Sequence, residues 1–124
     1  MTTKEERLYG IRGAVCAVNT RDDIVAKVCD LYTQILSKNT MCEEQIVSIQ
    51  FSVTNDLTAV NPASALRQSG NAQDCALFCC AEPLVDNGIP SVIRILITAY
   101  LDHKPESVYI HGAQNLRADL LRQK

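Results

Sequence analysis

The stretch CALFCCAEPLVDNGIPSVIRILITAYL, residues 75–101, contains two apolar segments separated by a turn. The first segment ends at Glu82, and the second carries Arg94 inside the run VIRILI. Removing water from a charge is costly unless an opposite charge meets it, so we expect Arg94 to have an anionic partner. That partner is either Glu82, in a structural salt bridge, or an anionic ligand, and these residues leave both open.

The composition favours one domain that spans residues 1–124, because a chain of this length with 47% hydrophobic residues can form one core. The net charge of −2 and the absence of a basic block argue against a nucleic-acid partner. The N-terminus MTTKEERLYG has no apolar signal region, so we expect no membrane association and a cytoplasmic location. The six cysteines lack zinc-site spacing, so we expect reduced thiols and no bound metal.

The periodicity of the apolar residues predicts an α+β fold. Apolar and alternating patterns predict strands over residues 8–18, 46–54, 75–81, 92–101 and 107–111. Helical spacing predicts a long helix that is capped by Thr20 and ends near Lys38, and Pro62 starts a short helix that ends before Gly70. One long helix cannot cover both faces of a five-stranded sheet, so we expect the second face to meet another copy of the chain.

Two further arginines lie in predicted elements. Alternation places Arg12 on one strand face with Gly10 and Ala14, where it is either an exposed edge residue or a ligand contact. Arg67 lies near the end of the short helix, where an arginine more often stabilises the helix terminus. The strand over 46–54 has an apolar face and a small polar face that suits a wet cavity or a subunit contact; the apolar face is expected to hold Val47, Ile49, Phe51 and Val53.

Several motifs occur together in a fixed order: GIRGA at 10–14, TNDLTAVNPASALR at 54–67, Cys79-x-x-Glu82, IR at 93–94, VY at 108–109 and LRADL at 116–120. In this combination the chain resembles the monofunctional, AroH-type chorismate mutase family over about residues 8–120. The resemblance implies a mixed five-stranded sheet in a chorismate mutase/RidA-like trimeric pseudo-barrel, with active sites between subunits. It also implies the cofactor-free Claisen rearrangement of chorismate to prephenate, in the biosynthesis of phenylalanine and tyrosine.

The resemblance further implies a role for each matching side chain. Arg94 would stabilise the charge that grows on the breaking ether oxygen, and Arg12 would bind a substrate carboxylate. Glu82, helped by Cys79, would accept a hydrogen bond from the ring hydroxyl, and Tyr109 would bond to a carboxylate or to the ether region. The remaining substrate-binding residues would be Arg67 at the cleft mouth, Phe78, Ala63, and a closing tail that includes Leu116 and Arg117.

Two positions depart from the family pattern. Asn61 replaces a usual aromatic residue and Ser64 a common lysine, which should weaken substrate capture more than chemistry. These departures keep a second interpretation open, a non-catalytic trimer that binds an anionic metabolite of the aromatic pathway. A third interpretation is a RidA-like enamine/imine deaminase, a class that forms similar trimers and also uses an arginine to bind a carboxylate.

Overall fold

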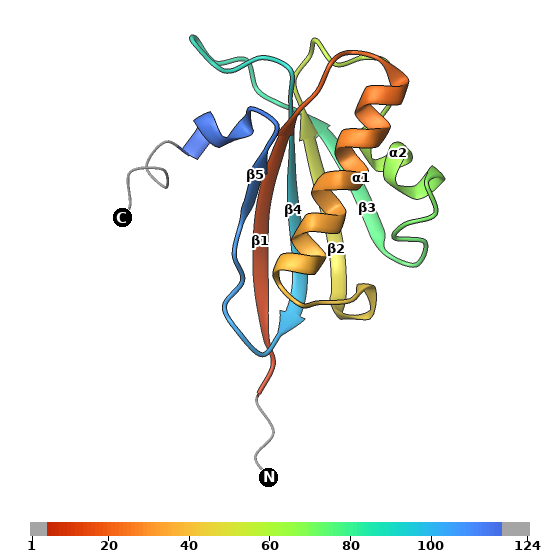
Figure 1. Ribbon diagram of the computed structural model, residues 1–124, viewed down its shortest axis with the longest axis vertical. Coiled ribbons are helices and arrows are strands. Elements are labelled where there is room, and N and C mark those ends of the chain that lie inside the picture. The colour runs from red at the N-terminus through yellow and green to blue at the C-terminus, as the bar shows by residue number, and fades with distance from the viewer. Residues whose placement is uncertain (1–4, 118–124) are drawn as a thin grey trace.

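A computed structural model describes residues 5–117, which form a mixed sheet with its helices on one face (Figure 1). The five strands are β1 (Arg7–Cys16), β2 (Ile46–Val53), β3 (Ala76–Ala81), β4 (Val92–Leu101) and β5 (Val108–Ile110). Their order in the sheet is β3-β2-β4-β1-β5. The strand predicted over 92–101 has those bounds, and the others begin or end within two residues of the prediction. The predicted α+β class is confirmed.

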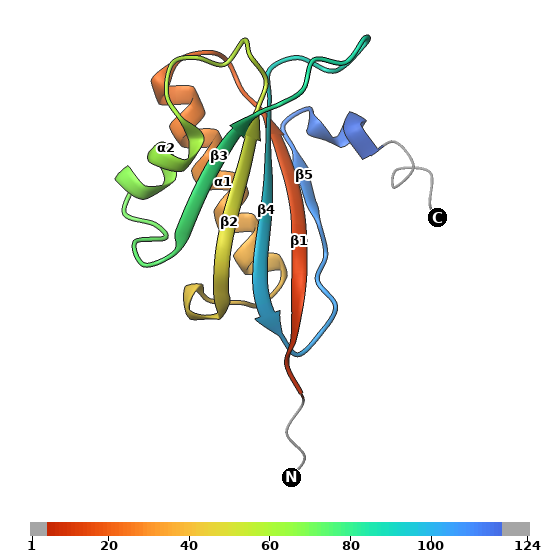
Figure 2. The same cartoon turned by 180° about the vertical axis from the view of Figure 1, so that it is seen from behind.

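The central strand is β4, which runs antiparallel to both of its neighbours, β1 and β2. The outer strands β5 and β3 run parallel to β1 and β2 respectively. As a consequence β2 lies between β3 and β4, although β3 and β4 follow each other along the chain (Figure 2). The loop that joins them, residues 82–91, therefore crosses the end of β2.

Both α-helices lie on the same side of the sheet. The long helix α1 (Arg21–Lys38) begins where the side chain of Thr20 accepts a hydrogen bond from the backbone N–H of Asp23, 3.1 Å away, as predicted. The second bond of a capping box, from the Thr20 N–H to the Asp23 carboxylate, does not form, because this carboxylate accepts a hydrogen bond from the Val18 N–H instead. The short helix α2 (Pro62–Gln68) packs against α1, β2 and β3. Two 3₁₀ turns, η1 (Glu43–Gln45) and η2 (Ala113–Arg117), complete the described elements. Among the helices of residues 5–117, none is long and apolar enough to cross a membrane.

The core fills the space between α1 and the sheet. Its fully buried side chains come mainly from α1, with Ile24, Val28, Leu31 and Ile35, and from β4, with Ile93, Ile97 and Leu101. Burial of one such side chain contributes about 1.5–3 kcal/mol. Because successive strand residues point to opposite faces, burial of the odd-numbered residues of β4 turns Arg94, Leu96 and Tyr100 to the other side.

We call that other side the open face, since α1 and α2 leave it uncovered (Figure 2). Within residues 5–117 its end near Val92 is covered, because Val92 forms a small buried cluster there with Ala113 of η2 and Ala14 of β1. Ser48, Gln50 and Ser52 of β2 also belong to the open face, as the alternation predicts. One residue of β2 was predicted wrongly. Val47 is 48% exposed rather than buried with Ile49, because a β-bulge between Ile46 and Ser48 inserts it as an extra residue.

Candidate active site

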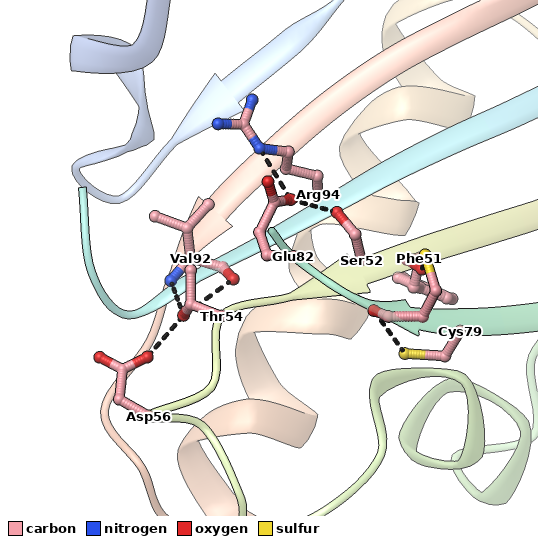
Figure 3. Close-up of polar contacts among 9 residues, drawn as sticks. Phe51, Ser52, Thr54, Asp56, Cys79, Glu82, Val92 and Arg94 are labelled. Atoms are coloured by element: carbon pink, nitrogen blue, oxygen red, sulfur yellow. Dashed lines mark hydrogen bonds and ion pairs between the residues drawn. The ribbon is translucent and has the colours of Figure 1, made fainter. Parts of the chain in front are cut away.

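Arg94 and Glu82 form a salt bridge on the open face. The Nε of Arg94 lies 3.0 Å from Oε1 of Glu82, and the Arg94 side chain is 45% exposed against 18% for Glu82. Figure 3 shows the two terminal nitrogens of Arg94 turned away from the carboxylate. The predicted acidic partner is therefore present, but it engages only one edge of the guanidinium, and the edge with the terminal donors points outward.

The Glu82 carboxylate is held by β2. The backbone N–H of Glu82 donates to the carbonyl of Val53 at 2.9 Å, which continues the β2–β3 ladder by one residue. The hydroxyl of Ser52 donates to the same Oε1 that meets Arg94. Ser52 is also the Cα partner of Arg94 in the β2–β4 ladder. Strand β2 thus fixes the position of Glu82, and the Glu82 carboxylate contacts the Nε edge of the Arg94 guanidinium (Figure 3).

A concavity of about 440 Å³ opens beside this salt bridge on the open face. Its lining includes the side chains of Arg12, Arg94, Tyr109 and Phe78. In the β1–β4 ladder Arg94 is opposite Ala14, so Arg12 is the diagonal neighbour of Arg94 on the same face. The Cα atoms of such a diagonal pair usually lie about 7–8 Å apart. Two guanidinium groups next to an exposed phenyl ring and a phenol can bind a small aromatic or alicyclic dianion.

A second cavity of about 470 Å³ is also lined by Arg94 and Glu82. It is bounded by the 82–91 loop and by η2, and Leu116 lines it together with Glu82 and Arg94. The structure therefore brings Leu116 next to the salt bridge. The side chain of Arg117 lies outside what the structure describes.

Three residues of the predicted site lie elsewhere in the chain. Ala63 and Cys79 pack against the core on the α1 side of the sheet, and burial raises the pKa of the Cys79 thiol. The guanidinium of Arg67 donates to the carbonyl of Cys75 at 2.6 Å, which ties the end of α2 to the segment before β3. A single chain therefore brings these three side chains into neither cavity beside Arg94.

The two departures from the family pattern lie at the start of α2, Asn61 as its N-cap and Ser64 in its first turn. The side chain of Asn61 caps this helix, because its Oδ1 accepts a hydrogen bond from the backbone N–H of Ala63 at 2.8 Å. Ser64 is exposed. An aromatic side chain at position 61 could not form this cap, so Asn61 has a structural role of its own.

The sequence motifs did not indicate the hydrogen-bonded group around Asp56, which lines the same cavity as Glu82 and Arg94. The Asp56 carboxylate accepts from the hydroxyl of Thr54 at 2.6 Å and from the backbone N–H of Ser91 at 2.9 Å. Hydrogen bonds from Thr54 and Ser91 stabilise the charged form and lower the pKa of Asp56. The T-x-D pattern at the end of a predicted strand was the available signal, since such short polar side chains bond to nearby backbone.

Comparisons with known proteins agree with the resemblance seen in the motifs. The family model for chorismate mutase type I matches residues 8–120. The chorismate mutase AroH of Bacillus subtilis is 33% identical over 117 residues, 91% of this chain and 92% of that protein. The AroH chorismate mutase of Thermus thermophilus is 34% identical over 116 residues, 90% of this chain and 94% of that protein. A solved structure of a chorismate mutase from Clostridium thermocellum is similar with a TM-score of 0.81 at 36% identity, covering 86% of this chain and 98% of that chain. The chain belongs to the type I chorismate mutase family.

Proposed function

We propose that this protein is a chorismate mutase, an isomerase that converts chorismate to prephenate. The observation that carries the proposal is the Arg94–Glu82 pair beside the concavity that Arg12 and Tyr109 also line. In the rearrangement the ether C–O bond breaks and a C–C bond forms within one molecule. No atom leaves and no electron is supplied, so binding, orientation and charge stabilisation are all that the side chains must provide.

Arg94 suits the central role because charge develops where its terminal nitrogens can reach. As the ether bond lengthens, negative charge grows on the ether oxygen, and a guanidinium already in place stabilises the transition state more than the ground state. The Nε contact with Glu82 and the location on β4 hold the guanidinium in place before the substrate arrives. Little reorganisation is then needed during the reaction.

Arg12 and Tyr109 suit the binding of the substrate in a compact form. Chorismate carries two carboxylates, and its side chain must fold over the ring before the bond can form. A guanidinium at Arg12 and a phenol at Tyr109, both on the concavity that Arg94 lines, would hold a carboxylate at a fixed distance from the reacting oxygen. Such orientation removes much of the entropic barrier to the reaction.

We infer that the complete site lies between two chains of a homotrimer. The supporting observation is that Arg12, Arg94 and Tyr109 line the open face, whereas the other predicted residues, Ala63, Arg67 and Cys79, lie on α2 and the α1 side of β3. A neighbouring copy that brings its α2 and β3 to this open face would join the two sets. The same copy would cover apolar side chains that the open face exposes, namely Phe78, Leu96 and Tyr100.

A cytoplasmic location is part of the proposal, because the six cysteines are all free thiols, which persist in a reducing compartment. Neither the deaminase nor the non-catalytic binder gains support from the family model and the relatives described above, which carry the name chorismate mutase.

The test is an assay of purified protein with chorismate. We expect the ultraviolet absorbance of chorismate to fall and prephenate to appear, identified by its conversion to phenylpyruvate in acid. Light scattering should give a mass of three chains. Binding of chorismate without turnover would instead support the non-catalytic binder, and release of ammonia from an imino acid would support the deaminase.

A further inference from the structure

The Asp56 carboxylate is bonded to two segments that meet at the start of β4. Its Oδ1 accepts from the Thr54 hydroxyl at 2.6 Å. Its Oδ2 accepts from Ser91 twice, from the backbone N–H at 2.9 Å and from the hydroxyl at 3.0 Å. Asp56 therefore links the residue that follows β2 to the residue that precedes β4. Figure 3 shows its bond to Thr54.

The Thr54 hydroxyl continues this link to the backbone of β4. It accepts a hydrogen bond from the backbone N–H of Val92 at 3.0 Å. A hydroxyl has one proton, and donation of that proton to Asp56 directs a lone pair toward Val92. The backbone N–H of Thr54 also donates to the carbonyl of Val92 at 3.1 Å. These bonds close the last rung of the β2–β4 ladder, one rung beyond Val53 and Ile93.

Asp56 also holds Ser91 in an unfavourable backbone conformation. Ser91 has φ of +61°, in the left-handed region that side chains with a Cβ seldom adopt. The carboxylate bonds to both its N–H and its hydroxyl, while the Ser91 carbonyl accepts from the N–H of Ala17 at 3.0 Å. This turn sets the direction in which the chain enters β4. The first residue of β4 is Val92, and Arg94 follows it by two positions.

We propose that Asp56 is a positioning residue, which fixes the start of β4 and thereby holds Arg94 against Glu82. The inference rests on the proposed function. Asp56 acts through its bonds to Thr54 and Ser91, and the direct partner of the Arg94 guanidinium is Glu82. A guanidinium that has to meet charge on one oxygen is sensitive to small displacements of the strand that carries it.

The first test is the kinetics of Asp56→Asn. The amide keeps the shape of the side chain but replaces one acceptor oxygen by a donor, so the hydrogen bond that the Thr54 hydroxyl donates must reverse or be lost. We expect kcat to fall on the order of 10- to 100-fold, as for small misplacements of a reacting group, while KM changes little. The matched control is Asp86→Asn, the same change of charge at an exposed residue of the 82–91 loop, for which we expect parental kcat.

Two further measurements separate positioning from a general loss of structure. Circular dichroism should show that Asp56→Asn is fully folded at the assay temperature. The ¹⁵N–¹H signal of the Arg94 Nε, assigned by its loss in Arg94→Lys, should exchange slowly with water in the parent and faster in Asp56→Asn, because its bond to Glu82 is weakened. Thr54→Val should reproduce the loss of kcat, and the double variant should lose little more.

Parental kcat in folded Asp56→Asn would overturn the inference. So would a lower kcat with an unchanged Arg94 signal, or a higher KM with kcat intact, since the last would place Asp56 in substrate capture. A parent that does not convert chorismate would refute the proposed function instead, so the two failures are distinct.

Discussion

Replacement of Arg94 by lysine tests the central role of the guanidinium. In the parent, the Nε contacts Glu82 at 3.0 Å and the terminal nitrogens point outward (Figure 3). The ammonium of lysine lies one bond beyond the position of Nε, where arginine has its central carbon. An ammonium at that position pairs with the Glu82 carboxylate, and nothing extends beyond it toward the substrate.

The expected fall in kcat follows from the hydrogen-bond donors that lysine lacks. Removal of one principal oxyanion donor costs about 100- to 1,000-fold in kcat, or about 2.7–4 kcal/mol. We expect Arg94→Lys to fall in this range, with the loss in kcat at least as large as any change in KM. The effect on folding should be at most about 1 kcal/mol, because the salt bridge is retained in part and Arg94 is 45% exposed.

The assay is steady-state conversion of chorismate by Arg94→Lys, with thermal unfolding and light scattering on the same sample. Arg21→Lys is a matched control, because Arg21 donates to Gln68 at 2.7 Å outside the proposed site. We expect the control to keep parental kcat. A near-parental kcat in folded, trimeric Arg94→Lys would refute the reasoning, because a point charge would then serve as well as the planar fork.

Further predictions address capture, closure, assembly and pH. Arg67→Ala should slow capture and make it less sensitive to salt, and loss of its bond to Cys75 should cost about 1 kcal/mol of stability; equal salt dependence in mutant and parent would exclude steering. Deletion of residues 116–124 should raise KM and spare most of kcat, and an unchanged KM would exclude a closing tail. Leu96→Asp should dissociate the trimer, measured by light scattering, and abolish turnover of chorismate. An intact trimer in this variant would show that the open face is not the interface. The pKa of Asp56 is lowered in the folded protein, so its carboxylate stabilises the fold fully above the pKa of an unfolded aspartate. This stabilisation is lost as pH falls through the folded-state pKa. The difference in Tm between the parent and Asp56→Asn should therefore disappear as pH is lowered from the unfolded-state pKa through the folded-state pKa.

Much of the fold was predictable because its signals are local. The alternation in residues 92–101 reports burial on one side of a strand, and the apolar stripe after Thr20 reports burial on one side of a helix. The bulge at Val47 was not predictable, because a bulge depends on the register of the partner strand and leaves the local pattern unchanged. The order of the strands was not predictable for the same reason.

Some of the predicted site residues lie together in the structure, but their arrangement was not predictable. The motifs indicated Arg12, Glu82, Arg94 and Tyr109, and Arg12, Arg94 and Tyr109 line one concavity. They did not indicate that Ser52 would hold the Glu82 carboxylate, or that Asp56 would bind the start of β4. Both contacts join segments that are distant in the sequence, and neither residue type is unusual for its place.

The sequence by itself determined the class of fold, the positions of most strands and helices, and membership of the family, because these depend on patterns within short segments and on the order of motifs. Only the tertiary structure decided that β2 lies between β3 and β4, which places Ser52 between Glu82 and Arg94. It also separated Arg67 and Cys79 from Arg94 within one chain. The physical reason is that pairing between distant strands is selected by the packing of the whole sheet, and local periodicity carries no information about which strands become neighbours.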